Sequence, residues 1–338
     1  MTNNAIFVEG LTKHFGSVAA LDGIDFEVPV GSVFGLLGPN GAGKTTAVRV
    51  LATVLHPDGG RAEVLGHDVV KDPGGVRLRI GLAGQSAAVD PNLTGRENLQ
   101  LIGKLAQLAR PLIDPRAAEL LDRFELSDAA DRPLRTYSGG MRRRLDVAAA
   151  LVQKPPVLFL DEPTTGLDLH SRNELWEMIR ELVADGTTVL LTTQYLEEAD
   201  RLAERVAVVD GGHVIANDTP ANLKAQMGST VIELGFEDPV TAERALRLIP
   251  ADVGRAELEG SLVRVNSETG AHALVEMLRS IDGDNLEPAT LTVREPSLDD
   301  VFLALTGHKA EQAVEEGDGE APDGGRGRRR ARAGRSAA

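Results

Sequence analysis

The stretch VFGLLGPNGAGKT, residues 33–45, decides the fold of this 338-residue chain. Its first five residues form an apolar run of the kind that makes a buried parallel strand. The next eight, Gly38–Thr45, match the pattern G-x-x-x-x-G-K-[ST], in which glycines let the loop curl so that successive backbone N–H groups face one anion. Lys44 can then reach the β- and γ-phosphates, and the Thr45 hydroxyl can bind Mg²⁺. We therefore predict a nucleoside triphosphate site between a strand and a helix.

A second apolar run ends in two carboxylates. Val157–Leu160 (VLFL) predicts a buried strand, and Asp161 and Glu162 follow it directly. Because ligands collect at the carboxyl ends of strands in α/β sheets, we expect Asp161 to hold Mg²⁺ through water. We expect Glu162 to polarise the attacking water as a general base. A strand that merely ends in acidic residues is the alternative, and the phosphate loop upstream argues against it.

Further motifs resemble those of the ATP-binding-cassette ATPases, and the resemblance covers residues 1–220. Tyr137–Met141 (YSGGM) resembles the signature loop of that family, and a helical pattern follows it. The resemblance implies that Ser138, Gly139 and Gly140 contact the ATP bound by a second copy of the chain. A lone S-G-G can simply cap a helix, so the order and spacing of the motifs carry this assignment.

The resemblance also implies roles for four single positions. Gln85 is similar to the glutamine that senses Mg²⁺ and the attacking water and couples to a membrane partner. Asp168, within the sequence GLD, resembles a residue that touches the opposite subunit. Phe15 stands where the family has an aromatic side chain that stacks on adenine, and a strand-edge core residue is the alternative. Gln194 stands where the family usually has a histidine; a glutamine amide can donate to the γ-phosphate but carries no proton charge, which leaves slow hydrolysis as the expectation.

The expected catalytic site combines residues from two copies of the chain. The expected catalytic residues are Lys44, Glu162 and Gln194, and the expected Mg²⁺ ligands are Thr45, Gln85 and Asp161. The expected ATP contacts from one copy are Phe15, Gly38, Pro39, Asn40, Gly41, Ala42, Gly43, Lys44, Thr45, Thr46 and Gln85. The expected contacts from the other copy are Ser138, Gly139, Gly140 and Asp168.

Three regions follow one another along the chain. Residues 1–227 predict an α/β nucleotide-binding cassette with a helical subdomain at about 86–150. Its expected strands are 6–9, 24–28, 32–37, 157–160, 188–192 and 205–210. Residues 228–306 predict the order βαββαβ of a small ferredoxin-like α+β unit, whose expected role is dimerisation or regulation. Residues 307–338 are rich in Gly, Ala and charge, and they predict a disordered tail.

Composition narrows the class of protein. The absence of cysteine excludes disulfides, thiolate metal sites and cysteine nucleophiles. A net charge of −15 disfavours a specific nucleic-acid partner, because phosphate repels an acidic chain. No stretch has the roughly 20 apolar residues that a spanning helix needs. We therefore expect the chain not to span the membrane itself. The resemblance implies a place at the cytoplasmic face of the membrane, attached to a separately encoded permease.

Two longer sequence segments are similar to segments of the daunorubicin-resistance type of drug exporter. They are Thr192–Asp200 (TTQYLEEAD) and Glu295–Phe302 (EPSLDDVF). The resemblance implies a homodimeric ATP-hydrolysing subunit that energises efflux of a drug or antibiotic, in a subgroup where glutamine is common at the position of Gln194. Export of lipid or polysaccharide is the alternative. A soluble cassette ATPase acting on DNA or ribosomes is disfavoured, because the chain has one phosphate loop and no cysteine zinc site.

Overall fold

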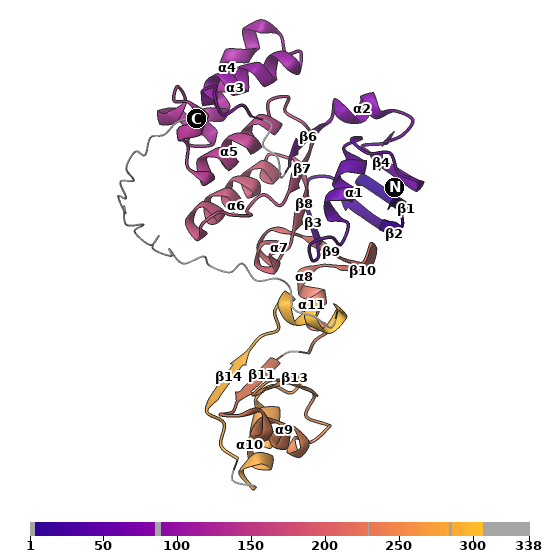
Figure 1. Ribbon diagram of the computed structural model, residues 1–338, viewed down its shortest axis with the longest axis vertical. Helices are drawn as coiled ribbons and strands as arrows, with labels where there is room; N and C mark the ends of the chain where they lie inside the picture. Colours follow the sequence, from indigo (N-terminus) through magenta and orange to yellow (C-terminus); the bar gives the residue numbers. More distant parts are fainter. Residues whose placement is uncertain (1–3, 85–88, 229, 284–285, 307–338) are drawn as a thin grey trace, which may run out of the picture.

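The computed structural model describes residues 4–84, 89–228, 230–283 and 286–306. Figure 1 shows two units along its long axis, a larger cassette and a smaller accessory unit. Gln85 and the predicted tail at 307–338 lie outside the described residues. No helix in the described part of the chain is both long and apolar enough to span a membrane.

A six-stranded sheet forms the centre of the cassette, in the order β10-β9-β3-β8-β7-β6. All neighbours are parallel except β10, which pairs antiparallel with β9 at one edge. Every residue of β3, β7 and β8 is buried, which explains their largely apolar sequences. The strands are β3 (Val33–Leu37), β6 (Ile80–Ala83), β7 (Val157–Asp161), β8 (Thr188–Thr193), β9 (Arg205–Asp210) and β10 (His213–Asp218). The predicted strands at 32–37, 157–160, 188–192 and 205–210 are confirmed.

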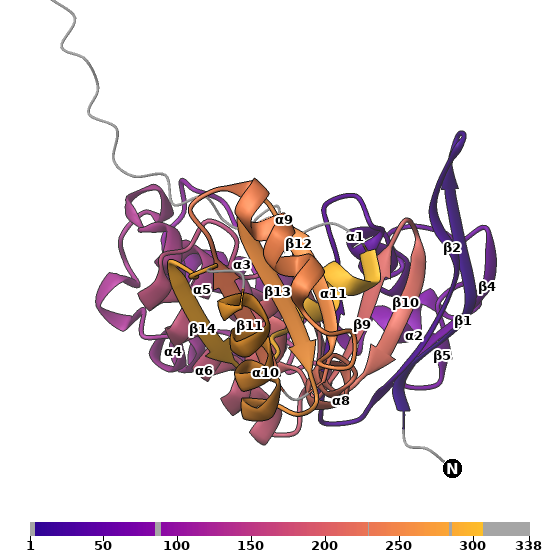
Figure 2. The same ribbon diagram turned by 90° about the horizontal axis from the view of Figure 1, so that it is seen from below.

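The first two predicted strands belong to a separate antiparallel sheet, of order β2-β1-β4-β5. We expected residues 6–9 and 24–28 among the strands of the α/β sheet, but they form a long hairpin with one face buried. Helix α1 packs between the two sheets in a shared apolar core. Figures 1 and 2 both show this sheet on the opposite flank from α3, α4 and α5. Its strands are β1 (Asn4–Phe15), β2 (Val18–Pro29), β4 (Gly59–Val64) and β5 (His67–Asp68).

Helices build the remainder of the cassette. Residues 94–152 form helices and no strand, as predicted, and a capping box of Thr94 and Glu97 starts α3. The helices of this subdomain are α3 (Gly95–Leu105), η1 (Ser127–Ala129), η2 (Leu134–Thr136), α4 (Arg110–Arg123) and α5 (Gly139–Ala150). The other cassette helices are α1 (Lys44–Leu51), α2 (Pro73–Arg77), α6 (Leu169–Ala184), α7 (Leu196–Leu202) and α8 (Pro220–Ala225).

The accessory unit has the ferredoxin-like order that the sequence predicted. Its strands pair antiparallel in the order β12-β13-β11-β14. Helices α9 and α10 cover the sheet face that points away from the cassette (Figure 1) and close a small core of their own. The elements are β11 (Thr230–Gly235), α9 (Pro239–Leu248), β12 (Arg255–Glu259), β13 (Leu262–Ser267), α10 (Ala271–Asp282), β14 (Thr290–Arg294) and α11 (Leu298–Thr306).

The last described helix, α11, packs differently from the prediction for residues 228–306. We expected it to complete the accessory unit, but its buried Leu298, Val301 and Phe302 belong to the apolar core of the cassette. They share that core with Leu202 of α7 and Leu223 of α8. The core of the accessory unit is built instead from its own sheet together with α9 and α10.

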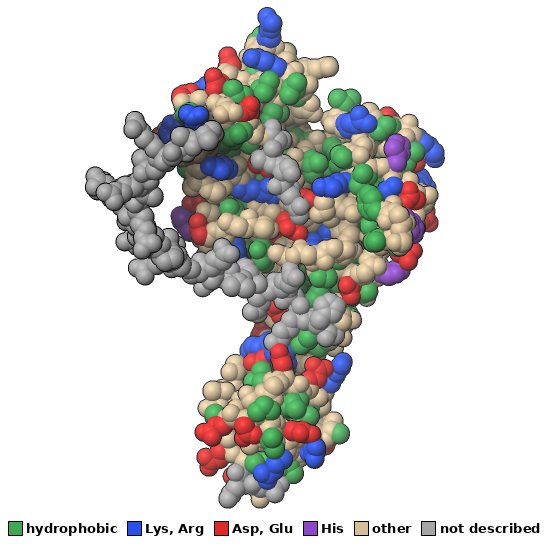
Figure 3. Space-filling view, in the orientation of Figure 1, with side chains coloured by type: hydrophobic (Ala, Val, Ile, Leu, Met, Phe, Trp, Pro, Cys, Tyr) green, Lys and Arg blue, Asp and Glu red, His purple; other side chains and the backbone are tan. Residues whose placement is uncertain are grey.

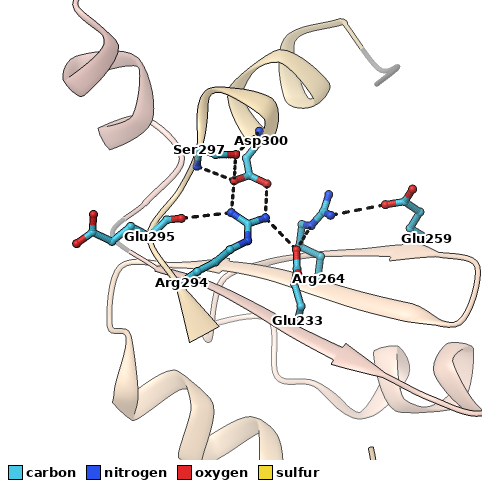
Figure 4. A network of polar contacts seen from close by, with 7 residues as sticks. All are labelled: Glu233, Glu259, Arg264, Arg294, Glu295, Ser297 and Asp300. Carbon is cyan, nitrogen blue, oxygen red and sulfur yellow. Dashed lines mark hydrogen bonds and ion pairs between the residues drawn. The ribbon is translucent and has the colours of Figure 1, made fainter. Parts of the chain in front are cut away.

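A polar network ties α11 back to the accessory sheet (Figure 4). Arg294, at the end of β14, donates two hydrogen bonds to Asp300, at 2.6 and 2.9 Å, and one to Glu233 at 2.9 Å. Asp300 also accepts from the backbone N–H of Ser297 at 2.8 Å. These donors hold the pKa of Asp300 below its usual range even though burial raises it. The motif Glu295–Phe302 is therefore a structural joint between the two units.

Candidate nucleotide site

The phosphate loop leaves the sheet at the carboxyl end of β3 and continues into α1. Gly41 and Gly43 have φ values of +81° and +111°, in the left-handed region that favours glycine. A Cβ on Gly43 would lie 2.3 Å from the carbonyl oxygen of Ala20, and one on Gly38 would lie 2.2 Å from that of Val209. Glycine is therefore required at these positions. The resulting tight loop precedes a helix N-terminus, where backbone N–H groups and the helix dipole favour an anion.

Lys44 is buried within this loop. Its Nζ atom donates to the carbonyl oxygens of Gly38 at 2.7 Å and Pro39 at 3.0 Å. The same atom lies 3.8 Å from Oε1 of Glu162, at the end of β7. The structure thus brings together two charged residues that were predicted from separate motifs.

The Asp161 carboxylate accepts hydrogen bonds from two hydroxyl groups on neighbouring elements. Thr45 of α1 donates to its Oδ1 atom at 3.0 Å, and Thr192 of β8 donates to the same atom at 2.6 Å. Asp161 itself is buried. Hydroxyl and carboxylate oxygens are the ligands that Mg²⁺ prefers, so Thr45 and Asp161 fit the predicted metal site.

Glu162 has an unusual backbone conformation, with a φ of +51°. Its N–H group donates to the carbonyl oxygen of Thr192 at 3.1 Å and to the Thr192 hydroxyl at 3.0 Å. Residues other than glycine seldom occupy this region, and they do so mainly at functional sites whose surroundings enforce it. The side chain carboxylate, which is mostly buried, lies between Lys44 and the Thr165 hydroxyl.

Arg143 is part of the site, and we did not predict it. The side chain comes from α5, five residues after Ser138, and reaches the ends of β6 and β7. It donates to the carbonyl oxygens of Gly84, Asp161 and Pro163 at 2.7, 3.1 and 2.7 Å. Burial lowers the pKa of Arg143, and the nearby Asp146 carboxylate opposes that shift. The sequence signal was present as three consecutive arginines, but nothing in it showed which one turns inward.

Gln194 follows β8 and stands beside this edge of the sheet. Its Oε1 atom is buried and has no hydrogen-bond partner among the described residues. Helix α7 begins two residues later and buries Glu198 completely. Burial raises the pKa of Glu198, although the indole of Trp176 donates to its Oε1 atom at 3.0 Å. The helix that follows Gln194 is therefore anchored by a buried acid.

The residues predicted to act on a second copy make local contacts. The Ser138 hydroxyl accepts from the N–H of Met141 at 3.2 Å and caps α5, and Asp168 caps α6 in the same way through the N–H of Ser171 at 2.8 Å. A Cβ on Gly140 would lie 2.5 Å from the Ser171 hydroxyl, so the two helix N-termini are adjacent. A cavity of about 450 Å³ lies between these two helix N-termini and the carboxyl ends of β6 and β7, which form the catalytic edge of the sheet. Its lining includes Gly139, Arg143, Glu162 and Gly166.

Phe15 lies at the end of β1 with half of its surface exposed. The alternative that it is a core residue is therefore wrong. Lys13 lies over its ring at 5.7 Å from the centroid. Stacking of the Phe15 ring on adenine stays a prediction. The predicted role of Gln85 falls on a residue outside the described ranges.

The phosphate loop, the acid pair and the capped S-G-G helix together define a nucleotide-hydrolysing cassette. The family model described as ABC transporter matches residues 21–165. The daunorubicin/doxorubicin resistance ATP-binding protein DrrA of Streptomyces peucetius is 50% identical over 92% of this chain and 97% of its own length. The Nod factor export ATP-binding protein I of Ralstonia nicotianae is 41% identical over 89% of this chain and 94% of its own length.

A solved structure gives the same result for the fold. The cbiO1 protein of Clostridium perfringens, part of the ABC transporter complex cbiONQ, matches with a TM-score of 0.62 and 26% identity, over 66% of this chain and 92% of that chain. This chain therefore belongs to the ATP-binding proteins of the ABC transporter family. It binds nucleotide and is an ATPase.

Proposed function

We propose that this chain energises the efflux of a drug or antibiotic through a separate membrane permease, as a homodimer on the cytoplasmic face. The observation that carries the proposal is the extent of the similarity to DrrA, which spans 92% of the chain and so reaches beyond the cassette. A cassette alone is common to many transporters. The joint at Glu295–Phe302 lies in the added part of the chain, where the accessory unit attaches.

The proposed ATP site is shared between two chains. One chain supplies the phosphate loop, Asp161, Glu162 and Gln194, and the other supplies the N-terminus of α5 and Asp168. Glu162 accepts a proton from the attacking water, Lys44 neutralises charge on the phosphates, and the Gln194 amide donates to the γ-phosphate. Contacts to the γ-phosphate from both chains close the dimer, and their loss after hydrolysis reopens it.

Mg²⁺ fits the same site. The hydroxyl of Thr45 and the carboxylate of Asp161 would hold it, together with Gln85. Bound there, Mg²⁺ neutralises negative charge on the phosphate oxygens. Thr192 keeps the Asp161 carboxylate in place by donating to its Oδ1 atom at 2.6 Å.

Exposed leucines on the helical subdomain support a membrane partner. Leu101 and Leu105 lie one turn apart on α3, and Leu112 lies on the neighbouring α4, with exposed fractions of 41, 73 and 58%. Hydrophobic side chains reach the surface over these two helices in Figure 3. Apolar side chains that gather on a polar surface mark interaction sites. We assign this surface to an apolar segment of the permease.

The test uses the chain together with its proposed permease subunit. The pair is reconstituted in proteoliposomes, and ATPase activity is measured with and without daunorubicin, with the Glu162→Gln variant as the inactive control. We expect daunorubicin to stimulate hydrolysis several-fold and to accumulate on the far side of the membrane. Hydrolysis that does not respond to the drug but rises with a Nod factor would instead support the second candidate function, export of the kind named for that relative.

A further inference from the structure

Three arginines in a row, Arg142–Arg144, follow the S-G-G residues, and they lie in different surroundings. Arg142 is exposed and donates to the carbonyl oxygen of Arg135 at 3.0 Å. Arg144 pairs with Glu125 at 3.2 Å and Glu174 at 3.6 Å. The Arg143 guanidinium reaches the ends of β6 and β7, where its side chain is 13% exposed. The function proposed above gives it no role.

The guanidinium group of Arg143 holds the backbone on both sides of Glu162. Its Nη2 atom donates to the carbonyl oxygen of Asp161 at 3.1 Å, and its Nε atom donates to that of Pro163 at 2.7 Å. These are the residues immediately before and after Glu162. Its Nη1 atom donates to Asp146 at 3.1 Å, which orients the group. A planar guanidinium presents its donors in a fixed fork, so the positions of both carbonyl groups are set together.

Glu162 needs such a constraint. Its φ of +51° lies in a region that residues other than glycine seldom adopt, and such a conformation persists only where the surroundings enforce it. Thr192 accepts the hydrogen bond of the Glu162 N–H group, which fixes one side of the peptide. Arg143 fixes the carbonyl groups of the two flanking residues. Together these contacts determine where the Glu162 carboxylate points.

We propose that Arg143 is a positioning residue for ATP hydrolysis, which aims the Glu162 carboxylate by clamping the backbone carbonyl groups on either side of it. The inference rests on the proposed role of Glu162 as the general base. The third carbonyl group, that of Gly84 at 2.7 Å, belongs to the end of β6, just before Gln85. The clamp therefore also joins the S-G-G helix α5 to the segment that leads to Gln85.

The first test measures kcat and KM for ATP with the full-length chain. We expect Arg143→Ala to lower kcat by at least ten-fold while KM changes less than three-fold, because Arg143 donates to carbonyl groups beside Glu162 and at the end of β6. Arg143→Lys should recover only part of kcat, since an ammonium cannot reach three diverging carbonyl groups. Asp146→Asn should lower kcat in the same direction by loosening the guanidinium. Arg144→Ala, the matched control, removes the same charge one residue away, outside the cavity that Glu162 lines, and should stay within two-fold.

The second test separates positioning from general damage. In a Glu162→Gln background there is no carboxylate left to aim, so adding Arg143→Ala should change single-turnover hydrolysis by less than two-fold. A further ten-fold loss there would overturn the inference, as would an unchanged kcat in Arg143→Ala or an equal loss in Arg144→Ala. If Arg143→Ala does not fold, the same hydrolysis measurements on Arg143→Lys and Asp146→Asn, in the wild-type and Glu162→Gln backgrounds, test the inference. Full activity of Glu162→Gln itself would refute the general base, whereas an inactive Glu162→Gln beside a normal Arg143→Ala would refute the clamp alone.

Discussion

Replacing Phe302 with alanine should destabilise the cassette, although Phe302 lies in the last described helix of the chain. Its side chain is 1% exposed and belongs to the same apolar core as α7 and α8. Truncating a buried phenylalanine to alanine typically costs about 3–5 kcal/mol, because apolar contact is lost and a cavity remains. Leu305, on the same helix, is 42% exposed, and its replacement by alanine should cost about 1 kcal/mol.

The single tryptophan of the chain makes this prediction measurable. Trp176 lies on α6, is almost completely buried, and belongs to the same core as Phe302. Its fluorescence during urea unfolding therefore reports on the cassette rather than on the accessory sheet. We expect Phe302→Ala to shift the midpoint of the Trp176 transition well below that of the Leu305→Ala control. Equal midpoints for the two variants would refute the packing of α11 on the cassette and return that helix to the accessory unit.

Three further predictions concern the catalytic edge. Glu162→Gln should lower kcat at least about 100-fold and trap a dimer in the presence of ATP and Mg²⁺, detectable by size-exclusion chromatography; normal turnover would remove Glu162 as the base. Gln194→Ala should bind ATP with near-normal affinity, by nucleotide fluorescence, yet hydrolyse it at least about ten-fold more slowly, and unchanged turnover would contradict the proposed contact of the Gln194 amide with the γ-phosphate. Burial raises the pKa of Glu198, so the folded protein keeps a proton that the unfolded chain releases above a pKa of 4.5, and this contribution to stability is lost as pH rises. Glu198→Gln has no proton to release, so the difference between its urea midpoint and that of wild type should rise from pH 5 to pH 8. A difference that does not vary with pH would argue against a raised pKa of Glu198.

The parts of the fold that sequence reasoning found are those with short-range signals. A glycine-rich loop between an apolar run and a helical pattern is complete within residues 33–51, so no distant partner is needed to recognise it. The same holds for helix starts, since the Ser138 and Asp168 caps are local contacts. The order of strands and helices in the accessory unit was also predictable, because these elements alternate at regular spacing.

The parts that sequence reasoning missed depend on distant partners or on exposed polar strands. The edge strand β10, HVIAND, has no fully buried residue, so it carries no apolar run. The division of strands between two sheets depends on pairing between β1 and β4, about 50 positions apart in the chain. Arg143 is a similar case, because its partners are carbonyl groups, and a carbonyl group is present at every position of a sequence.

The position of α11 bears on what the accessory unit can do. Helix α7 begins two residues after Gln194 and ends at Leu202, which shares the apolar core of α11. A single short helix therefore lies between Gln194 and the joint that carries the accessory sheet. Because packed cores move between discrete arrangements rather than deforming continuously, a displacement of α7 would have to be accommodated by α11. Arg294 fixes α11 to the sheet through two hydrogen bonds to Asp300, so the displacement would continue into β14. Two roles were expected for the accessory unit, dimerisation and regulation. Regulation could act through the contacts that run from α7 through α11 to β14 within one chain, whereas dimerisation would need a surface that contacts a second chain.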